Sequence, residues 1–367
     1  MMQTQAAVVV ATHDLSIETV ELDEPKAGEV LVRLEAAGVC HSDLHVYHGE
    51  MGTAPPLVLG HEGAGVVEAI GAGVTRVKPG DTVIINWLPA CENCTNCLNE
   101  EYNSCERIAE TNFNGHMLDG TTRIKRADGT SVKHYLGAAT MAQHTIVSEA
   151  GVIPIPDDVP FDVAAIIGCA VVTGVGAVIN TAQATTGSSA AVIGCGGIGL
   201  SVIQGCKLAG CYPIIAVDMV AEKLDFARTM GATHTINGKE TKVFNELLAM
   251  GRPDFVFDSV GAAATIPQAL KSARPGGAAV IVGLHAAAQK VPISPATLVF
   301  ENKRLYGSFV GSSRPRTDLP KLIELYRGGR LDLDTLITAR YTLDQVDQAF
   351  DDMLAGKILG RGVLTFN

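Results

Sequence analysis

The sequence is poor in charged residues and in long apolar runs. Aspartate, glutamate, lysine and arginine make up 18% of the 367 residues, and no block of like charges occurs. Because such blocks are typical of disordered segments, we expect a folded chain. No segment approaches the roughly 20 uninterrupted apolar residues of a membrane span. The composition therefore predicts a protein without a transmembrane anchor.

The first residues lack the features of a signal peptide. Met1 to Gln5 show no basic region followed by an apolar stretch, so we expect a cytoplasmic protein. Thiols stay reduced in that compartment, which favours metal binding over disulfides as the use of the nine cysteines. The formal net charge of -11 repels phosphate backbones and anionic lipid, and this argues against nucleic-acid and membrane partners.

The length and composition suit two domains of an α/β protein, with 47% hydrophobic residues and 39 glycines. No long helical period precedes about residue 160, so the first part is predicted to be β-rich. Asp128-Gly129, between residues 123–126 and 130–133, predicts a tight hairpin. The other strands predicted here are residues 7–10, 30–34, 65–70 and 83–86.

The pattern changes near residue 162, where an apolar stretch to residue 179 predicts a buried helix. Apolar strands and helices then alternate, which indicates a doubly wound parallel sheet covered on both faces. From about residue 310 the alternation ends. The strands predicted in this part are residues 190–194, 213–218, 254–258, 278–283 and 362–366, and the helices are 197–209, 221–230, 318–327 and 343–355.

A glycine-rich fingerprint, G-x-G-x-x-G, lies between a predicted strand and a predicted helix. It consists of Gly194, Cys195, Gly196, Gly197, Ile198 and Gly199. This context indicates dinucleotide binding, with the pyrophosphate at the helix N-terminus. Asp218 ends the next strand at roughly the usual spacing of about 20 residues, where its carboxylate would bind the ribose and favour NAD over NADP. The alternative is a glycine-rich turn that binds nothing.

Four cysteines lie close together in a polar segment, in the pattern C-x2-C-x2-C-x7-C. Four thiolates at this spacing can enclose one tetrahedral zinc in a closed, structural site. An iron–sulfur cluster and chance clustering are the alternatives. The residues are Cys91, Cys94, Cys97 and Cys105.

A second set is dispersed along the chain: Cys40, His61 and Cys169. Two thiolates and one imidazole with an open fourth position would make a catalytic zinc site. Taken singly, each is also a typical buried side chain, and spacing alone cannot show that the three converge.

Several motifs together resemble the medium-chain, zinc-containing alcohol dehydrogenases over essentially the whole chain. The matching stretches are Gly38 to His45, Gly60 to Gly65, the four-cysteine segment, Gly168-Cys169 with Thr173-Gly174, the glycine fingerprint with Asp218, and Arg361 before Leu364-Thr365-Phe366. The long segment from Cys105 to about residue 150 is similar to the dimeric branches of the family, so the resemblance implies a homodimer.

The resemblance implies the fold and the site roles. It predicts a β-rich, GroES-like catalytic domain of residues 1–170 and 310–367, and a Rossmann NAD-binding domain of residues 171–309. Cys40, His61 and Cys169 would bind the catalytic zinc, with two zinc ions per chain in all. The other implied roles are Glu62 near the metal, Asp43 orienting the histidine, Ser42 and His45 in a proton relay, His41 and Arg361 at the pyrophosphate, Thr173 beside the nicotinamide, and Lys223 near the adenosine ribose.

The resemblance implies NAD-linked oxidation of a primary alcohol, aromatic alcohols included, or reduction of its aldehyde. Trp87, Leu284 and Phe309 are expected to line an apolar pocket. Family branches that oxidise the glutathione adduct of formaldehyde carry an arginine where this chain has Ala109, and they carry an acidic insertion between Cys40 and His61 that is lacking here. Two alternatives remain: a formaldehyde dehydrogenase that depends on another thiol, and a zinc-ribbon protein that binds nucleic acid, which the acidic charge disfavours.

Overall fold

The computed structural model describes residues 1–50, 53–284 and 289–366, and the chain divides into two compact units. The first unit comprises Met1–Cys169, Arg314–Gly328 and Leu333–Asn367, and the second comprises Ala170–Ser313 and Gly329–Asp332. The predicted boundaries lie at 170/171 and 309/310. Residues 329–332 join the second unit, where the Gln204 side chain donates to the Asp332 carbonyl at 3.2 Å and accepts from its N–H at 2.7 Å.

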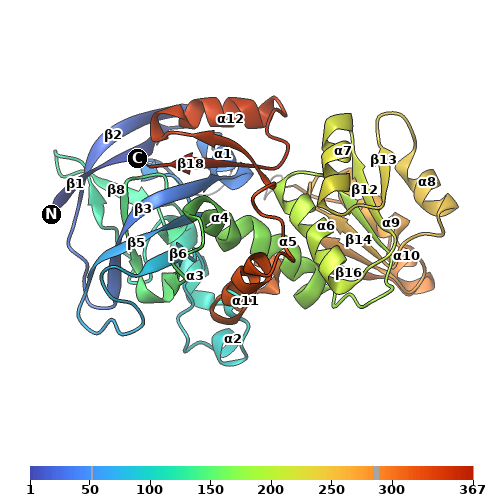
Figure 1. Cartoon of the computed structure of the whole chain (residues 1–367), viewed down its shortest axis with the longest axis horizontal. Helices are drawn as coiled ribbons and strands as arrows, with labels where there is room; N and C mark the ends of the chain where they lie inside the picture. Colours follow the sequence, from blue (N-terminus) through green and yellow to red (C-terminus); the bar gives the residue numbers. More distant parts are fainter. Residues whose placement is uncertain (51–52, 285–288, 367) are drawn as a thin grey trace. The chain divides into compact units, whose positions relative to one another are not determined.

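The first unit is β-rich, as the sequence predicts (Figure 1). Among the described residues, β1, β2, β7, β8 and β4 close into a barrel, and a second sheet has the order β10-β6-β5-β3-β18-β17, with β9 also paired to β3. The predicted hairpin is confirmed as the antiparallel pair β7–β8. The strands are β1 (Met2–Ala11), β2 (Asp14–Leu22), β3 (Glu29–Val39), β4 (Leu57–Val58), β5 (Gly63–Ile70), β6 (Thr82–Ile85), β7 (Ile124–Lys125), β8 (Ser131–His134), β9 (His144–Ser148), β10 (Val152–Pro154), β17 (Ile337–Tyr341) and β18 (Arg361–Thr365).

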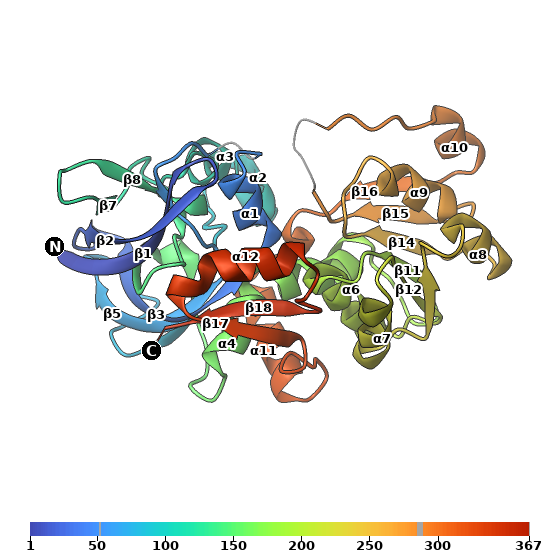
Figure 2. The same ribbon diagram turned by 90° about the horizontal axis from the view of Figure 1, so that it is seen from above.

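Helices in this unit are few and mostly short. Figure 2 shows α12 running along β17 and β18. Barrel residues that alternate inward, such as Ala6 and Val8 on β1 and Val20 and Leu22 on β2, are fully buried in one core cluster. The α-helices are α1 (His41–Tyr47), α2 (Thr95–Leu98), α3 (Glu106–Glu110), α4 (Phe161–Ile166), α11 (Pro315–Arg327) and α12 (Val346–Leu354).

The second unit contains a parallel sheet with the order β13-β12-β11-β14-β15-β16 in the described part of the chain. Figure 1 shows α6 and α7 on one face of this sheet and α8 and α9 on the other, which confirms the predicted doubly wound arrangement. The elements are α5 (Val172–Gly176), β11 (Ala190–Ile193), α6 (Gly197–Ala209), β12 (Ile214–Asp218), α7 (Ala221–Met230), β13 (His234–Asn237), α8 (Val243–Ala249), β14 (Phe255–Asp258), α9 (Thr265–Ser272), β15 (Ala278–Ile281), α10 (Pro295–Phe300) and β16 (Arg304–Gly307).

We expected no apolar segment long enough to span a membrane, and the helix predicted at 162–179 contradicts this. It extends over Phe161–Thr181, and its 21 residues are long and apolar enough to span a membrane by length and composition alone. Its apolar character has another cause, because 89% of its most apolar window is buried inside the protein. Two π-helical turns, η5 (Ile167–Val171) and η6 (Ala177–Thr181), interrupt the α-helical hydrogen bonding.

Candidate active site

The dispersed residues Cys40, His61 and Cys169 converge in the first unit, together with Glu62. Their metal-binding atoms all lie within 4.8 Å of one another. Cys40 directly follows β3, and His61-Glu62 directly precede β5. Because β3 and β5 pair antiparallel, with Ala37 opposite Gly63, the end of one strand meets the start of the other.

Cys169 reaches the cluster from the π-helical turn η5, so its side chain is not placed by a regular helical repeat. Glycine keeps the cluster tight. A Cβ at Gly38 would lie 2.0 Å from Oε2 of Glu62, and Gly60 adopts a φ of +91° that disfavours other residues. The backbone at both strand ends therefore depends on these two glycines.

His61 is held in one orientation. Its Nδ1 lies 3.2 Å from Oδ1 of Asp43, which also accepts the Gly60 N–H at 3.0 Å. The rings of Trp87 and Tyr135 meet the imidazole edge-on, each with a centroid distance of 5.6 Å. Its Nε2 is buried and has no hydrogen-bond partner among the described residues, although buried polar atoms are normally paired. An imidazole anchored through Nδ1 presents Nε2 as a metal ligand.

A buried arginine lies beside the acidic groups of this cluster. Arg361, at the start of β18, forms a buried ion pair with Glu62. Burial raises the pKa of Glu62 to about 7 against the opposing effect of Arg361. A hydrogen bond from Cys169 holds the pKa of Cys40 well below its usual range although burial opposes it. The Arg361 guanidinium therefore has a partner that sequence analysis did not assign, and its role at the cofactor pyrophosphate stays a prediction.

The donor set fits zinc. Two cysteine sulfurs and one histidine nitrogen, all buried here, are the kind of ligand set found in catalytic zinc sites that keep one position for substrate. The Glu62 carboxylate is close by, and its Oε2 is also buried without a partner among the described residues. When bound, zinc would supply Lewis-acid chemistry at this point.

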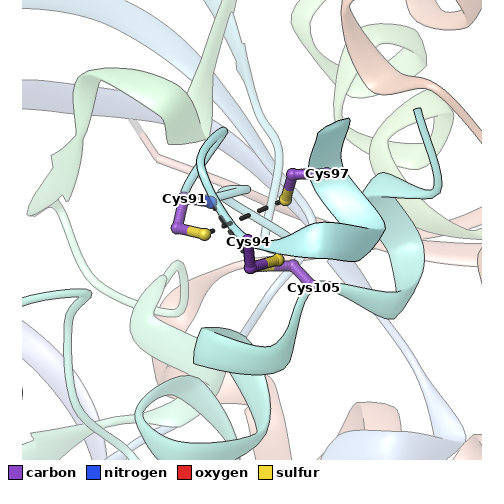
Figure 3. A group of neighbouring side chains, drawn as sticks. All are labelled: Cys91, Cys94, Cys97 and Cys105. Atoms are coloured by element: carbon purple, nitrogen blue, oxygen red, sulfur yellow. Dashed lines mark hydrogen bonds between the residues drawn. The ribbon is translucent and has the colours of Figure 1, made fainter. Parts of the chain in front are cut away.

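The four clustered cysteines form a second group whose ligand atoms lie close enough together to hold one metal ion (Figure 3). Cys94 caps α2, Cys97 lies within it, and Cys105 precedes α3. The Cys91 and Cys97 sulfurs are 3.9 Å apart. A tetrahedral site with zinc–sulfur bonds of about 2.3 Å has sulfur–sulfur edges of about 3.8 Å, so the spacing fits. Backbone N–H groups of Cys97 and Glu106 lower the pKa of Cys94 to about 6, whereas burial raises the pKa of Cys97 and of Cys105.

The predicted proton-relay residues share one short helix. Ser42 and His45 are three residues apart on α1 and therefore lie on the same side of it. Ser42 is half-buried and its carbonyl accepts the Tyr135 hydroxyl at 3.0 Å, while His45 is 9% exposed. His41, at the start of the helix, is exposed. Tyr135 and Glu50 belong to no sequence motif and were not predicted here; Oε2 of Glu50 lies 2.6 Å from Nδ1 of His45.

The glycine fingerprint lies in the second unit between β11 and α6, as predicted. Gly194 has a φ of +90°, and a Cβ at Gly199 would lie 1.8 Å from the Gly194 carbonyl oxygen, so both positions need glycine. A Cβ at Gly196 would meet no atom within 4 Å, which leaves open space at the start of α6 where a phosphate could approach. Gly197 and Ile198 begin α6.

Asp218 ends β12, and both of its carboxylate oxygens are engaged by backbone. Oδ2 accepts the Cys195 N–H at 2.7 Å, and Oδ1 accepts the N–H groups of Met219 at 2.7 Å and Val220 at 3.0 Å. The acid therefore ties the fingerprint turn to the start of α7. Lys223, half-buried on α7, is in the same unit.

The remaining predicted residues are placed as follows. Thr173 is buried on α5. Trp87 is 6% exposed and its ring lies edge-on to His61, and its place in a substrate pocket stays a prediction. Leu284 and Phe309 belong to the second unit and are 57% and 43% exposed.

Comparison with known proteins identifies relatives over the full length. Residues 26–157 match the family described as alcohol dehydrogenase GroES-like domain, and residues 197–327 match zinc-binding dehydrogenase. An alcohol dehydrogenase class-3 of Cereibacter sphaeroides is 41% identical, with 100% of both chains covered. An S-(hydroxymethyl)glutathione dehydrogenase of Paracoccus denitrificans is 40% identical over 99% of this chain and 100% of its own.

Solved structures give the same result. An alcohol dehydrogenase zinc-binding domain protein from Burkholderia ambifaria has a TM-score of 0.95 at 34% identity, covering 100% of this chain and 99% of its own. Benzyl alcohol dehydrogenase from Acinetobacter calcoaceticus has a TM-score of 0.94 at 30% identity, covering 100% of both chains. With two zinc-type ligand sets and a glycine fingerprint in place, this chain belongs to the medium-chain zinc-containing alcohol dehydrogenase family.

Proposed function

We propose that this enzyme oxidises the primary hydroxyl of an S-hydroxymethyl thiol, the adduct of formaldehyde with a small thiol, using NAD as hydride acceptor. The observation that carries the chemistry is the buried set Cys40, His61 and Cys169, with the unpartnered Nε2 of His61 among them. The substrate class is supported by the full-length relatives, which are named for S-(hydroxymethyl)glutathione. Ala109 and the short segment before His61 favour a thiol other than glutathione.

In this proposal the chain's own residues have separate tasks. Cys40, His61 and Cys169 hold zinc, and Asp43 fixes the His61 ring so that Nε2 is the ligand atom. Ser42 takes the hydroxyl proton of the substrate and passes it toward His45 and solvent. Their position on one side of α1 supports this relay.

The second unit would bind the cofactor. Gly196 leaves room for the pyrophosphate at the N-terminus of α6, Gly194 and Gly199 allow the tight turn and close packing before it, and Thr173 would lie beside the nicotinamide. The Asp218 carboxylate would accept hydrogen bonds from the adenosine ribose, assisted by Lys223, and would repel a 2′-phosphate. We therefore propose a preference for NAD over NADP.

A second candidate substrate class is supported by a separate observation. The Trp87 ring meets His61 edge-on, and an aromatic wall beside the metal would suit an apolar or aromatic primary alcohol. The benzyl alcohol dehydrogenase of similar structure agrees with this class. Both candidates share the same bond-breaking chemistry, oxidation of a primary hydroxyl, and differ in what surrounds it.

A steady-state assay of NADH formation separates the two candidates. Formaldehyde would be supplied with glutathione, with cysteine, with coenzyme A and with no thiol, beside ethanol and benzyl alcohol. We expect formaldehyde oxidation that depends on an added thiol and exceeds benzyl alcohol oxidation in kcat/KM. Benzyl alcohol turnover without any thiol-dependent activity would replace the first candidate by the second.

We also propose a cytoplasmic homodimer, which light scattering and cell fractionation would test.

A further inference from the structure

The carboxylate of Glu50 lies against His45 at the end of α1. Oε2 of Glu50 is 2.6 Å from Nδ1 of His45, and the histidine side chain is only 11% exposed while that of Glu50 is 42% exposed. A contact this short is typical of a charge-assisted hydrogen bond. Neither the fingerprint motifs nor the zinc ligands account for Glu50.

The backbone at the end of α1 brings Glu50 back over His45. Gly49 adopts a left-handed φ of +72°, its N–H donates to the Val46 carbonyl at 3.0 Å, and the Glu50 N–H donates to the His45 carbonyl at 2.8 Å. This pair of bonds is a Schellman motif, which reverses the chain at a helix end. The position of Glu50 over His45 therefore follows from the local fold, and the side-chain contact is its consequence.

We propose that Glu50 is a positioning residue that fixes the tautomer and ring orientation of His45. A carboxylate can only accept a hydrogen bond, so Nδ1 carries the hydrogen and Nε2 carries the lone pair. The role of this tautomer in catalysis rests on the proposed function. The proton that leaves the substrate hydroxyl through Ser42 would be accepted at Nε2 and then released to solvent. The same arrangement of carboxylate, imidazole and hydroxyl orients the base in hydrolase triads.

A purely structural role for Glu50 makes different predictions. If Glu50 only stabilised the end of α1, its loss would lower stability and affect every variant of the enzyme equally. If Glu50 acts through His45, its loss should matter only while His45 is present, because two residues that act as one unit are not additive.

The first experiment reads the tautomer directly and needs no substrate. Nitrogen-15 NMR of labelled histidine in the zinc-loaded protein without cofactor would compare wild type, Glu50→Ala and Glu50→Gln. His45, assigned by its loss in His45→Gln, should carry its proton on Nδ1 in wild type and Glu50→Gln, and on Nε2 in Glu50→Ala. An unchanged tautomer in Glu50→Ala would overturn the proposal, whatever the substrate proves to be.

The second experiment measures kcat/KM on the best substrate of the panel above. Glu50→Ala should lower it about 10-fold, which is less than the factor of about 10²–10⁴ that a general base contributes, because the His45 imidazole itself remains. In a His45→Gln background the same change should have an effect of less than about 2-fold. Glu110→Ala, which removes an exposed acid on α3, is the matched control and should resemble wild type.

The outcomes separate the two proposals. An equal loss from Glu50→Ala in both backgrounds would assign Glu50 a structural role. Absence of turnover by wild type on every substrate would contradict the proposed function instead, and the NMR result would still decide the tautomer. If Glu50→Ala does not fold, Glu50→Leu, which keeps a similar size but has no acceptor, replaces it in both backgrounds of the cycle.

Discussion

Replacing Asp218 by asparagine tests the cofactor site, because the structure shows that this change does more than remove a charge. Oδ2 accepts one backbone N–H, from Cys195, and Oδ1 accepts two, from Met219 and Val220. Asparagine has one side-chain carbonyl oxygen, so it can accept either the Cys195 N–H or the N–H groups of Met219 and Val220, but not both. The favoured rotamer keeps the two bonds at the start of α7 and turns the amide NH2 toward the Cys195 N–H.

The cost can be estimated from that mismatch. One hydrogen bond to a charged group contributes about 1.5–3 kcal/mol, and here a donor would also face a donor. A loss of about 2 kcal/mol in the fingerprint turn would lower kcat/KM with NAD about 30-fold, at about 1.4 kcal/mol for each factor of ten. With NADP the relief of charge repulsion offsets part of this loss, so the ratio of NADP to NAD use should rise while neither cofactor is used well.

The assay is steady-state formation of NADH and NADPH by wild type and Asp218→Asn, with thermal unfolding as a check on the fold. The matched control is Asp225→Asn, a change on the exposed face of α7, which should alter neither the ratio nor the rates. Wild-type kcat/KM that is equal for both cofactors would refute the role of Asp218. So would a variant that keeps full efficiency with NAD, since the backbone argument requires a loss.

Three further predictions concern the metals, the barrel and the pocket. Cys169→Ser should lose one zinc and all activity but stay folded, whereas Cys97→Ser should lose the other zinc and aggregate; metal analysis that finds equal loss of both metals in each variant would contradict separate roles. Burial lowers the pKa of His134 to about 3, so its unfolded form gains a proton first as the pH falls. Stability should therefore decrease from about pH 6.5 toward about pH 3, by up to about 1.4 kcal/mol per pH unit, and urea titrations should show a flatter decrease in His134→Gln. Trp87→Ala should shift an alcohol chain-length series toward bulkier substrates and cost about 3–5 kcal/mol of stability, and an unchanged series would place Trp87 outside the pocket.

The regular part of the fold was predictable because parallel strands buried on both faces leave continuous apolar runs. Residues 190–194 and 213–218 correspond to β11 and β12, which form the centre of the sheet with β14. Short strands such as β4 and β10 were missed, since two or three residues carry no measurable alternation. A helix was predicted at 162–179 and is observed at 161–181, but its two π-helical turns were not predicted, because they follow from packing rather than from periodicity.

Some residues of the candidate site were likewise predictable from the sequence, and others were not. Spacing alone identified the four clustered cysteines, since their ligand atoms come together within one short segment. Glu50 and Tyr135 were missed because neither has a motif, and each gains its role only through a contact with α1. Glu62 was expected near the metal, whereas its ion pair with Arg361 joins residues nearly 300 positions apart.

By itself, the sequence determined the family, the parallel dinucleotide-binding unit and the chemistry of the donor groups, because these depend on residue type and local spacing. Only the tertiary structure decided that Cys40, His61 and Cys169 meet, since their meeting depends on the antiparallel register of β3 and β5 and on a π-helical turn. It also decided which nitrogen of His61 is anchored and which carboxylate lies against His45. Such contacts depend on side-chain directions within a few ångströms. These directions are set by the folded backbone and cannot be read from the pattern of residue types along the chain.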